Sequence, residues 1–309
     1  MRFSTAFVAM AAMASATITT AAPAPSPANN QTLTILNYAL SLEYLEAEFY
    51  KQGLAKFNES DFTNGGFNSS VRDRFVHIGE HENEHIMVLT SVIKNMTGTP
   101  VSACNYTFPM DNVTQFLAVA QALETTGVSA YLGAASGLRG NLLTTAASIT
   151  TVEARHAAYL NELWGQSAAP YAFDTPLGTR EVLTLAMNFI SSCPHNMTVK
   201  PFNQLMATLP ASGSNSTMVT TSFQGVGANS TSTYCQFLFS NYVAVSPRSE
   251  CALPDIATGY VYVFVTRNVI PITLTKDSNV LAGPALLFNG AHNNGTATNG
   301  TTTNGTTTN

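Results

Sequence analysis

Apolar residues recur at intervals of three and four positions through most of the first two-thirds of this 309-residue chain. That spacing places them on one face of an α-helix. Short loops rich in Gly, Asn, Ser or Pro interrupt the pattern. The sequence therefore predicts a mainly α fold, with four long helices and a fifth after them, over residues 31–56, 71–97, 112–137, 141–164 and 179–192. The break between the third and fourth helices is short, so we expect these two to be antiparallel neighbours in a four-helix bundle.

The pattern changes at about residue 200, where Ser, Thr, Gly and Asn become frequent and helical spacing fades. Residues 259–266 alternate aromatic and β-branched side chains, and residues 269–275 follow after an Arg-Asn turn. Alternation of this kind is typical of two strands joined in a hairpin. We therefore expect a small β-rich extension over residues 200–288, whose function the pattern does not indicate. Residues 289–309 repeat Asn, Gly and Thr, which predicts a disordered, glycosylated tail.

The first residues have the composition of an export signal. Met-Arg-Phe precedes an apolar stretch, small-residue sites and a Pro-rich segment. This order predicts a signal peptide over residues 1–22 and a linker over residues 23–30. A membrane anchor is the alternative, but the apolar stretch is short and interrupted by Ser and Thr, and no other segment is apolar enough to cross a bilayer. Twelve Asn-x-Ser/Thr sites occur along the chain. We therefore expect a glycoprotein secreted to the extracellular space or the cell wall.

Charge and cysteine content fit that class of protein. Only 10% of the residues are charged, against about a quarter in typical soluble domains, so glycans would supply solubility. The net charge of −5 and the lack of a basic patch argue against a nucleic-acid partner. Four cysteines in an oxidising compartment predict two disulfides, and of the three connectivities we favour Cys104–Cys193 and Cys235–Cys251. No Cys-x-x-Cys occurs, which argues against a cysteine metal site.

Two Glu-x-x-His pairs stand on the apolar faces of predicted helices: Glu82 with His85, and Glu153 with His156. At about 100° per residue, both pairs fall in the middle of an apolar stripe. The stripes consist of Phe75, Ile78, Leu89 and Ile93 around the first pair, and of Ala146, Ile149, Leu160 and Trp164 around the second. The alternative, a polar pair on a solvated face, does not fit this placement.

A single glutamate, with a tyrosine seven positions later, occurs on each of the two remaining helices. The first pair is Glu43 with Tyr50, and the second is Glu124 with Tyr131 in a nearly uncharged stretch. Burying an unpaired carboxylate is costly, but a metal ion supplies the opposite charge. Four carboxylates and two neutral imidazoles would balance two divalent ions. The residues thus form the ligand set of a four-helix bundle that holds two metal ions.

Two assignments stay open. Glu46 and Glu48 follow Glu43 closely, so either could be the ligand on the first helix. We favour Glu43 because its spacing to Tyr50 matches the spacing of the corresponding pair on the third helix. The two tyrosines either donate their hydroxyls to carboxylates beside the metal or take part in redox chemistry.

Glu-x6-Tyr followed by Glu-x-x-His, twice over, resembles the ferritin-like superfamily of carboxylate-bridged di-metal bundles. The segments LEYLEAEFY, HENEH and VEARHAAYL resemble secreted ferritin-like proteins of fungi, which are related to plant desiccation-related and stress-response proteins. The resemblance covers residues 31–194, which we take as the ferritin-like di-metal bundle. Carried over by position, it implies six metal ligands: Glu43, Glu82, His85, Glu124, Glu153 and His156.

The resemblance implies two functional hypotheses. In the first, the bundle binds two divalent metal ions, iron by preference and manganese next, because oxygen and imidazole ligands suit these ions. Dioxygen or peroxide would be the reactant, in the oxidation of ferrous iron or in the removal of peroxide under stress. In the second hypothesis, the chain is a non-catalytic, extracellular or wall-associated stress protein that keeps the bundle as a scaffold.

A rival motif overlaps the first Glu-x-x-His pair. His81, Glu82 and His85 form His-Glu-x-x-His, the helical signature of zinc proteases, in which the histidines bind zinc and the glutamate is the general base. No recognisable third ligand follows downstream. The motif also leaves Glu153 and His156 unexplained. We therefore keep a zinc protease only as a minor alternative.

Overall fold

The structure is a computed structural model that describes residues 27–196, 199–210, 216–274 and 277–289. The predicted signal peptide and the tail from residue 290 lie outside these residues. The first described helix begins at Pro27, within the segment that the sequence pattern assigned to a linker.

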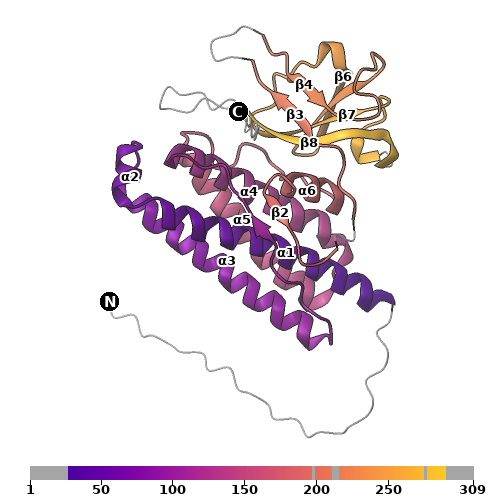
Figure 1. Ribbon diagram of the computed structural model, residues 1–309. Coiled ribbons are helices and arrows are strands. Elements are labelled where there is room, and N and C mark those ends of the chain that lie inside the picture. Colours follow the sequence, from indigo (N-terminus) through magenta and orange to yellow (C-terminus); the bar gives the residue numbers. More distant parts are fainter. Residues whose placement is uncertain (1–26, 197–198, 211–215, 275–276, 290–309) are drawn as a thin grey trace, which may run out of the picture.

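Four long helices lie side by side and form a bundle (Figure 1). They are α1 (Pro27–Lys56), α3 (Ser69–Asn95), α4 (Val113–Ala134) and α5 (Gly140–Leu163). Helix α1 packs along α3, and α4 packs along α5 after the single turn of η1 (Ala135–Gly137). The predicted mainly α four-helix bundle with a further helix, α6 (Thr179–Ala186), is therefore confirmed.

Asparagine side chains fix the starts of three helices. Asn58 precedes the short α2 (Glu59–Asn64), which the sequence pattern did not predict. Its side chain accepts hydrogen bonds from the backbone N–H groups of Ser60 and Asp61, while Asp61 accepts from the backbone of Asn58. Asn68 and Asn112 cap α3 and α4 in a similar way. These caps satisfy N–H groups that have no partner inside the helix.

The interior of the bundle consists of two apolar clusters separated along the helices by a polar layer. One cluster includes Phe49, Phe75, Phe116 and Leu160, and the other includes Leu40, Leu89, Ile93 and Ile149. Each long helix passes from one cluster to the other, with buried glutamates between its apolar residues. The predicted apolar stripes around the Glu-x-x-His pairs are indeed buried. This arrangement places the polar layer far from the helix ends.

The strands of the C-terminal part gather on one side of the bundle, next to α6 (Figure 1). Four of them form an antiparallel sheet in the order β6-β5-β7-β8, and β3 pairs with β4. The bounds are β3 (Leu205–Thr208), β4 (Thr220–Phe223), β5 (Tyr234–Phe239), β6 (Tyr242–Pro247), β7 (Gly259–Thr266) and β8 (Val280–Asn289). The predicted β-rich character of this region is confirmed.

Strand β7 is apolar on both faces because it separates two cores. Val261, Val263 and Val265 point into the core of the β-rich part. Tyr262 and Phe264 point the other way, into a cluster shared with α6 and α4. The two faces of a strand alternate with a period of two residues. The sheet therefore packs directly on the bundle.

Two sequence predictions about this region were wrong. The fifth helix ends at Ala186 rather than at residue 192, because residues 190–192 form strand β2 (Ile190–Ser192), which pairs with β1 (Asn105–Tyr106). The second strand of the predicted hairpin, residues 269–275, is not a strand over its described residues 269–274. Its backbone at Ile270 and Ile272 bonds to the side chain of Gln236 instead. Strand β7 pairs with β8 and β5.

Both predicted disulfides are present. Cys104–Cys193 joins the ends of β1 and β2, and Cys235–Cys251 lies within the β-rich part. Among the described residues, no helix has the length and apolar character to cross a membrane. All described asparagines of the Asn-x-Ser/Thr sites are exposed, namely Asn30, Asn58, Asn68, Asn95, Asn105, Asn112, Asn196 and Asn229.

Candidate metal centre

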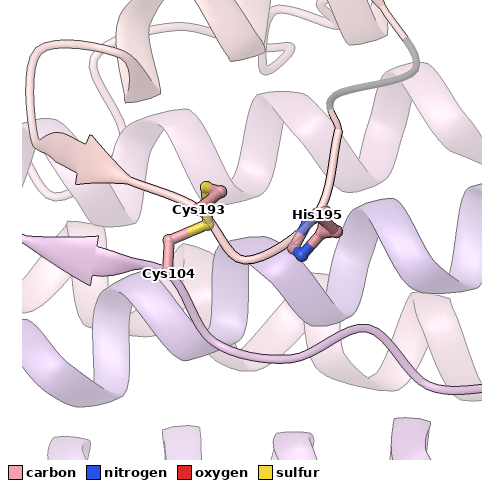
Figure 2. Close-up of side chains that lie close together, drawn as sticks. All are labelled: Cys104, Cys193 and His195. Atoms are coloured by element: carbon pink, nitrogen blue, oxygen red, sulfur yellow. A yellow bond between two sulfur atoms is a disulfide. The ribbon is translucent and has the colours of Figure 1, made fainter.

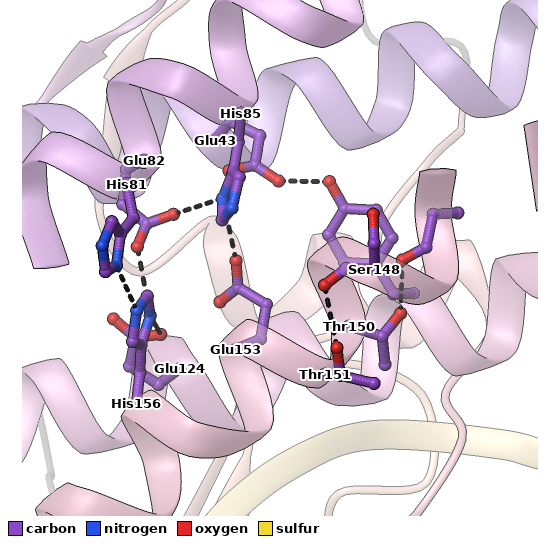
Figure 3. A network of polar contacts seen from close by, with 12 residues as sticks. Glu43, His81, Glu82, His85, Glu124, Ser148, Thr150, Thr151, Glu153 and His156 are labelled. Atoms are coloured by element: carbon purple, nitrogen blue, oxygen red, sulfur yellow. Dashed lines mark hydrogen bonds and ion pairs between the residues drawn. The ribbon is translucent and has the colours of Figure 1, made fainter. Parts of the chain in front are cut away.

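The structure brings all six predicted ligands together in the polar layer of the bundle (Figure 3). They form two overlapping groups whose nitrogen and oxygen atoms lie within 4.8 Å of one another. The groups are Glu43, Glu82, His85 and Glu153, and Glu82, Glu124, Glu153 and His156. Glu82 and Glu153 belong to both groups.

The imidazole of His85 faces three carboxylates through one nitrogen. Its Nδ1 atom lies 2.9 Å from Glu82, 3.1 Å from Glu43 and 3.2 Å from Glu153. One N–H group can donate one good hydrogen bond, so it cannot satisfy all three carboxylates. A cation at this point would satisfy them together.

The imidazole of His156 occupies the equivalent position in the second group. Its Nδ1 atom lies 3.0 Å from Glu124 and 3.3 Å from Glu82. Its Nε2 atom lies 3.0 Å from Nδ1 of His81, and the two rings are stacked at 7°. His81 is exposed on the surface. It therefore fixes the orientation of the His156 ring from the solvent side, a role that the sequence pattern did not predict.

Each of the two tyrosines donates a hydrogen bond to the glutamate of the other helix, across α1 and α4. Tyr50 on α1 donates to Glu124 on α4, and Tyr131 on α4 donates to Glu43 on α1. Seven residues of helix separate each tyrosine from its own glutamate by about 10 Å, which is too far for direct contact. The two hydroxyls therefore orient Glu124 and Glu43, each of which also contacts one histidine. Donation to a carboxylate is the first of the two roles considered for these tyrosines above.

The glutamates of the polar layer are buried completely. Glu43, Glu82, Glu124 and Glu153 are 0% exposed. Burial raises the pKa of Glu43 to about 7 and raises that of Glu153 well above its ordinary value. Both groups would lose their protons to the solvent when a cation binds, because a positive charge restores the preference for the carboxylate form.

For Glu82 and His85, contacts with oppositely charged groups outweigh the effect of burial on the pKa. Burial alone would raise the pKa of Glu82, but contacts with His156 and His85 lower it to about 2. Burial would lower the pKa of His85, but contacts with Glu153, Glu43 and Glu82 raise it to about 12. The protonated ring therefore compensates part of the negative charge. A divalent ion would take over that compensation and displace the proton.

Unsatisfied carboxylate oxygens are a second observation that fits a divalent ion at this site. Both carboxylate oxygens of Glu153, and Oε1 of Glu82, are buried without a well-formed hydrogen bond among the described residues. Glu153 Oε1 and Glu82 Oε1 have only a histidine nitrogen at 3.2 and 3.3 Å. Buried oxygens without partners are costly. Oxygen and imidazole donors suit iron and manganese.

The three candidate glutamates of α1 differ in burial and in contacts. Glu48 lies near the surface and pairs with Lys51 at 2.8 Å. Glu46 is buried, but it belongs to neither ligand group. Burial, followed by the charge of Glu153, raises its pKa well above the ordinary value. Of the three candidates, Glu43 alone contacts a histidine of the centre.

The zinc-protease motif does not assemble in this geometry. His85 points into the bundle, whereas His81 contacts the outer nitrogen of His156 (Figure 3). No group of potential metal ligands found among the described residues contains His81.

A second cluster of potential ligands, Cys104, Cys193 and His195, lies between β1 and the end of β2 (Figure 2). The two sulfur atoms are joined in a disulfide. A disulfide has no thiolate to offer a metal. This cluster is therefore a structural link in the oxidised chain.

Comparisons with known proteins agree with the fold. Residues 31–166 match the family described as ferritin-like domain. Protein rds1 of Schizosaccharomyces pombe (strain 972 / ATCC 24843) is 32% identical over 162 residues, which cover 52% of this chain and 39% of that relative. The match thus spans well under half of the length of rds1.

A solved structure is also similar. The crystal structure of ferritin like, diiron-carboxylate proteins from Bacillus anthracis str. Ames aligns with a TM-score of 0.40 at 20% sequence identity. The alignment covers 45% of this chain and 99% of that chain. Residues 31–166 of this chain are thus similar to ferritin-like domains.

Proposed function

We propose that the bundle binds two divalent metal ions, iron by preference and manganese next, with Glu82 and Glu153 as the shared ligands. The observation that carries this proposal is the position of His85. Its single Nδ1 atom faces three buried carboxylates, and one proton cannot satisfy them. Glu43 and His85 would complete one ion's ligands, and Glu124 and His156 the other's.

Bound iron or manganese supplies redox chemistry toward dioxygen or peroxide, so we propose oxidation of ferrous iron or removal of peroxide as the activity. The chain's own residues prepare the site. The hydroxyls of Tyr50 and Tyr131 orient the two carboxylates that are not shared. The apolar clusters on either side of the polar layer exclude water from it. Low local polarity strengthens every charge interaction there.

We further propose that the protein acts outside the cell, free or attached to the wall, in a stress response. The two disulfides and the exposed Asn-x-Ser/Thr sites support an oxidising, extracellular setting.

Elemental analysis tests the proposal. Full-length protein purified without added metal should contain roughly two ions of iron or manganese per chain, as a di-metal bundle requires. Glu153→Ala should lose most of that metal, because it removes a shared ligand. Glu162→Ala on the same helix is the matched control, since Glu162 is exposed, and its metal content should equal that of the unmodified chain. Full metal content in Glu153→Ala would contradict the ligand assignment.

The alternative is a scaffold without catalysis. It is favoured by the aromatic packing around Phe116, which contacts Phe49, Phe57 and Phe75 and holds the bundle without help from the polar layer. A chain that stays folded in chelator and takes up neither Fe²⁺ nor Mn²⁺ would support this alternative and contradict the metal proposal.

A further inference from the structure

A cavity of about 260 Å³ lies where the bundle meets the β-rich part. Helices α1 and α4 form one side, the residues at the end of α6 form a second, and strands β3 and β8 close the third. The walls are mostly leucine and alanine. The polar side chains among the lining residues are Glu46, Thr126, Asn188 and Gln204.

Glu46 is the unusual member of this lining. Its side chain is only 4% exposed. None of the hydrogen bonds or ion pairs found among the described residues involves it. A buried carboxyl group without a partner is costly. Glu46 lines the cavity, and its Oε1 atom lies close to Gly127, another lining residue, so a molecule in the cavity could supply the missing hydrogen bond.

Gly127 on α4 brings this cavity close to the candidate metal centre. A Cβ atom at this position would lie 3.0 Å from Oε1 of Glu46 and 3.1 Å from Oε2 of Glu153. The missing side chain therefore leaves the carboxyl of Glu46 and a shared carboxyl of the centre on either side of one small space. Gly127 itself lines the cavity. A molecule held at Glu46 would lie beside the centre.

Size and wall chemistry limit the class of ligand. Binding cavities for small organic molecules are mostly apolar, with a few placed polar groups. An apolar cavity of roughly 150 Å³ holds benzene, so the larger space here admits one ring with a short alkyl chain. The side walls from Leu123, Leu185 and Leu286 offer only apolar contacts. Glu46 offers a hydrogen-bond acceptor at one place.

We propose that this cavity binds a small, apolar organic molecule that carries one hydroxyl group, and that the hydroxyl donates a hydrogen bond to the carboxyl group of Glu46. The site goes beyond the proposed metal function, because its lining includes none of the six metal ligands. Binding therefore does not depend on metal, and the two proposals can fail separately.

Calorimetric titration of the full chain with a matched pair of probes tests the proposal. 4-Butylphenol carries the hydroxyl, and butylbenzene has the same ring and chain without it. A hydrogen bond to a buried carboxyl should make 4-butylphenol bind at least about tenfold more tightly. The titration is run on chelator-treated and on metal-supplied protein. Equal binding of the two probes, or no binding of either, would overturn the proposal.

Two variants locate the site. Glu46→Leu should reduce the preference for 4-butylphenol over butylbenzene to about one, because it removes the carboxyl acceptor and leaves the rest of the lining unchanged. The variant should fold, since replacing an unpartnered buried polar group by an apolar one is nearly neutral or stabilising. A preference that persists in Glu46→Leu would exclude Glu46 as the anchor.

Ala122→Phe should fill the cavity from α4 and abolish binding of both probes. Ala147→Phe on the exposed face of α5 is the control for the size of the substitution and should bind as the unmodified chain does. Unchanged binding in folded Ala122→Phe would place the ligand elsewhere. If Ala122→Phe does not fold, the comparison of the two probes and the Glu46→Leu variant still test the proposal. A chain that takes up neither Fe²⁺ nor Mn²⁺ yet binds 4-butylphenol would contradict the proposed function and support this one.

Discussion

A bound metal ion would compete with protons for the same atoms at Glu43 and His85. Burial raises the pKa of Glu43 to about 7, and the surrounding carboxylates raise that of His85 to about 12. Near neutral pH the His85 ring is therefore protonated, and Glu43 is protonated in part. A metal ion that binds here must displace these protons, so its affinity should rise with pH.

The stability of the metal-free chain should change in the opposite direction. Between pH 4.5, the ordinary pKa of Glu43, and about 7 the folded chain holds a proton that the unfolded chain has lost. The free energy of unfolding therefore falls as pH rises through this range. His85 continues the decrease above pH 6.5, whereas Glu82, with its lowered pKa, loses its contribution only as pH falls below 4.5.

We predict that the melting temperature of chelator-treated protein falls from pH 5 to pH 8, the range these pKa shifts define. Over the same range, the rise in melting temperature on adding Mn²⁺ should become larger. Thermal denaturation at several pH values with constant ionic strength measures both. A metal-induced rise that is the same at every pH would contradict the proton competition.

The hydroxyls of Tyr50 and Tyr131 should tune metal affinity without being ligands. Tyr50→Phe removes the hydrogen bond to Glu124, and Tyr131→Phe removes the bond to Glu43. Loss of such an orienting partner typically lowers metal affinity by roughly 10- to 100-fold. Competition with a coloured chelator measures the change. Tyr159→Phe is the control, because Tyr159 is half-buried and its ring packs against Phe75 in the apolar cluster. An unchanged affinity in both variants would exclude this orienting role.

At the scale of elements, the close approach of α4 to the chain before α6 depends on one glycine. A Cβ atom at Gly133 would lie 1.7 Å from the carbonyl oxygen of Leu177, whose own N–H donates to Ser129 on α4. Backbone atoms on both sides leave no flexible side chain to move. The contact holds the segment that leads into α6 against the bundle.

Gly133→Ala should lower the free energy of unfolding by roughly 1–3 kcal/mol, the usual effect of overpacking. Chemical denaturation monitored by circular dichroism measures this change. Ser136→Ala, an exposed neighbour, is the control and should stay within about 0.5 kcal/mol of the unmodified chain. If Gly133→Ala is as stable as the control, α4 and the chain near Leu177 are not packed this closely.

Local pattern predicts helices better than strand partners in this chain. The apolar stripes that contain Glu82 and Glu153 could be predicted from the helical period alone, because residues three and four apart share a face. Strand β7 was also evident from its own alternation. Its neighbour β8 was not, because pairing joins residues far apart in sequence, such as Val261 with Leu287. The segment after β7 is apolar, yet Gln236 binds its backbone and prevents pairing.

For the whole molecule, the sheet and the bundle share a core. Phe264 of β7 is 0% exposed and packs with Leu177, Val182 and Leu185. A hydrogen bond of 2.8 Å joins Tyr262 of the same strand to Ser129 on α4. We therefore expect the bundle and the β-rich part to unfold together in one transition.

Phe264→Ala should cost roughly 3–5 kcal/mol, as removal of a fully buried phenylalanine typically does. It should also separate the single thermal transition into two. Differential scanning calorimetry detects both effects. Val226→Ala changes an exposed residue of the same region and should leave the transition intact. Two transitions in the unmodified chain would contradict the shared core.

The sequence by itself determined the helices of the bundle and the six side chains of the polar layer, because helical period and Glu-x-x-His spacing are local properties. The tertiary structure decided which helix each tyrosine serves, which carboxylates are shared, and that Glu46 borders a cavity rather than joining the ligand groups. These features depend on how helices lie against one another and against the sheet. Contacts between segments far apart in the chain produce no periodic pattern in the amino-acid sequence.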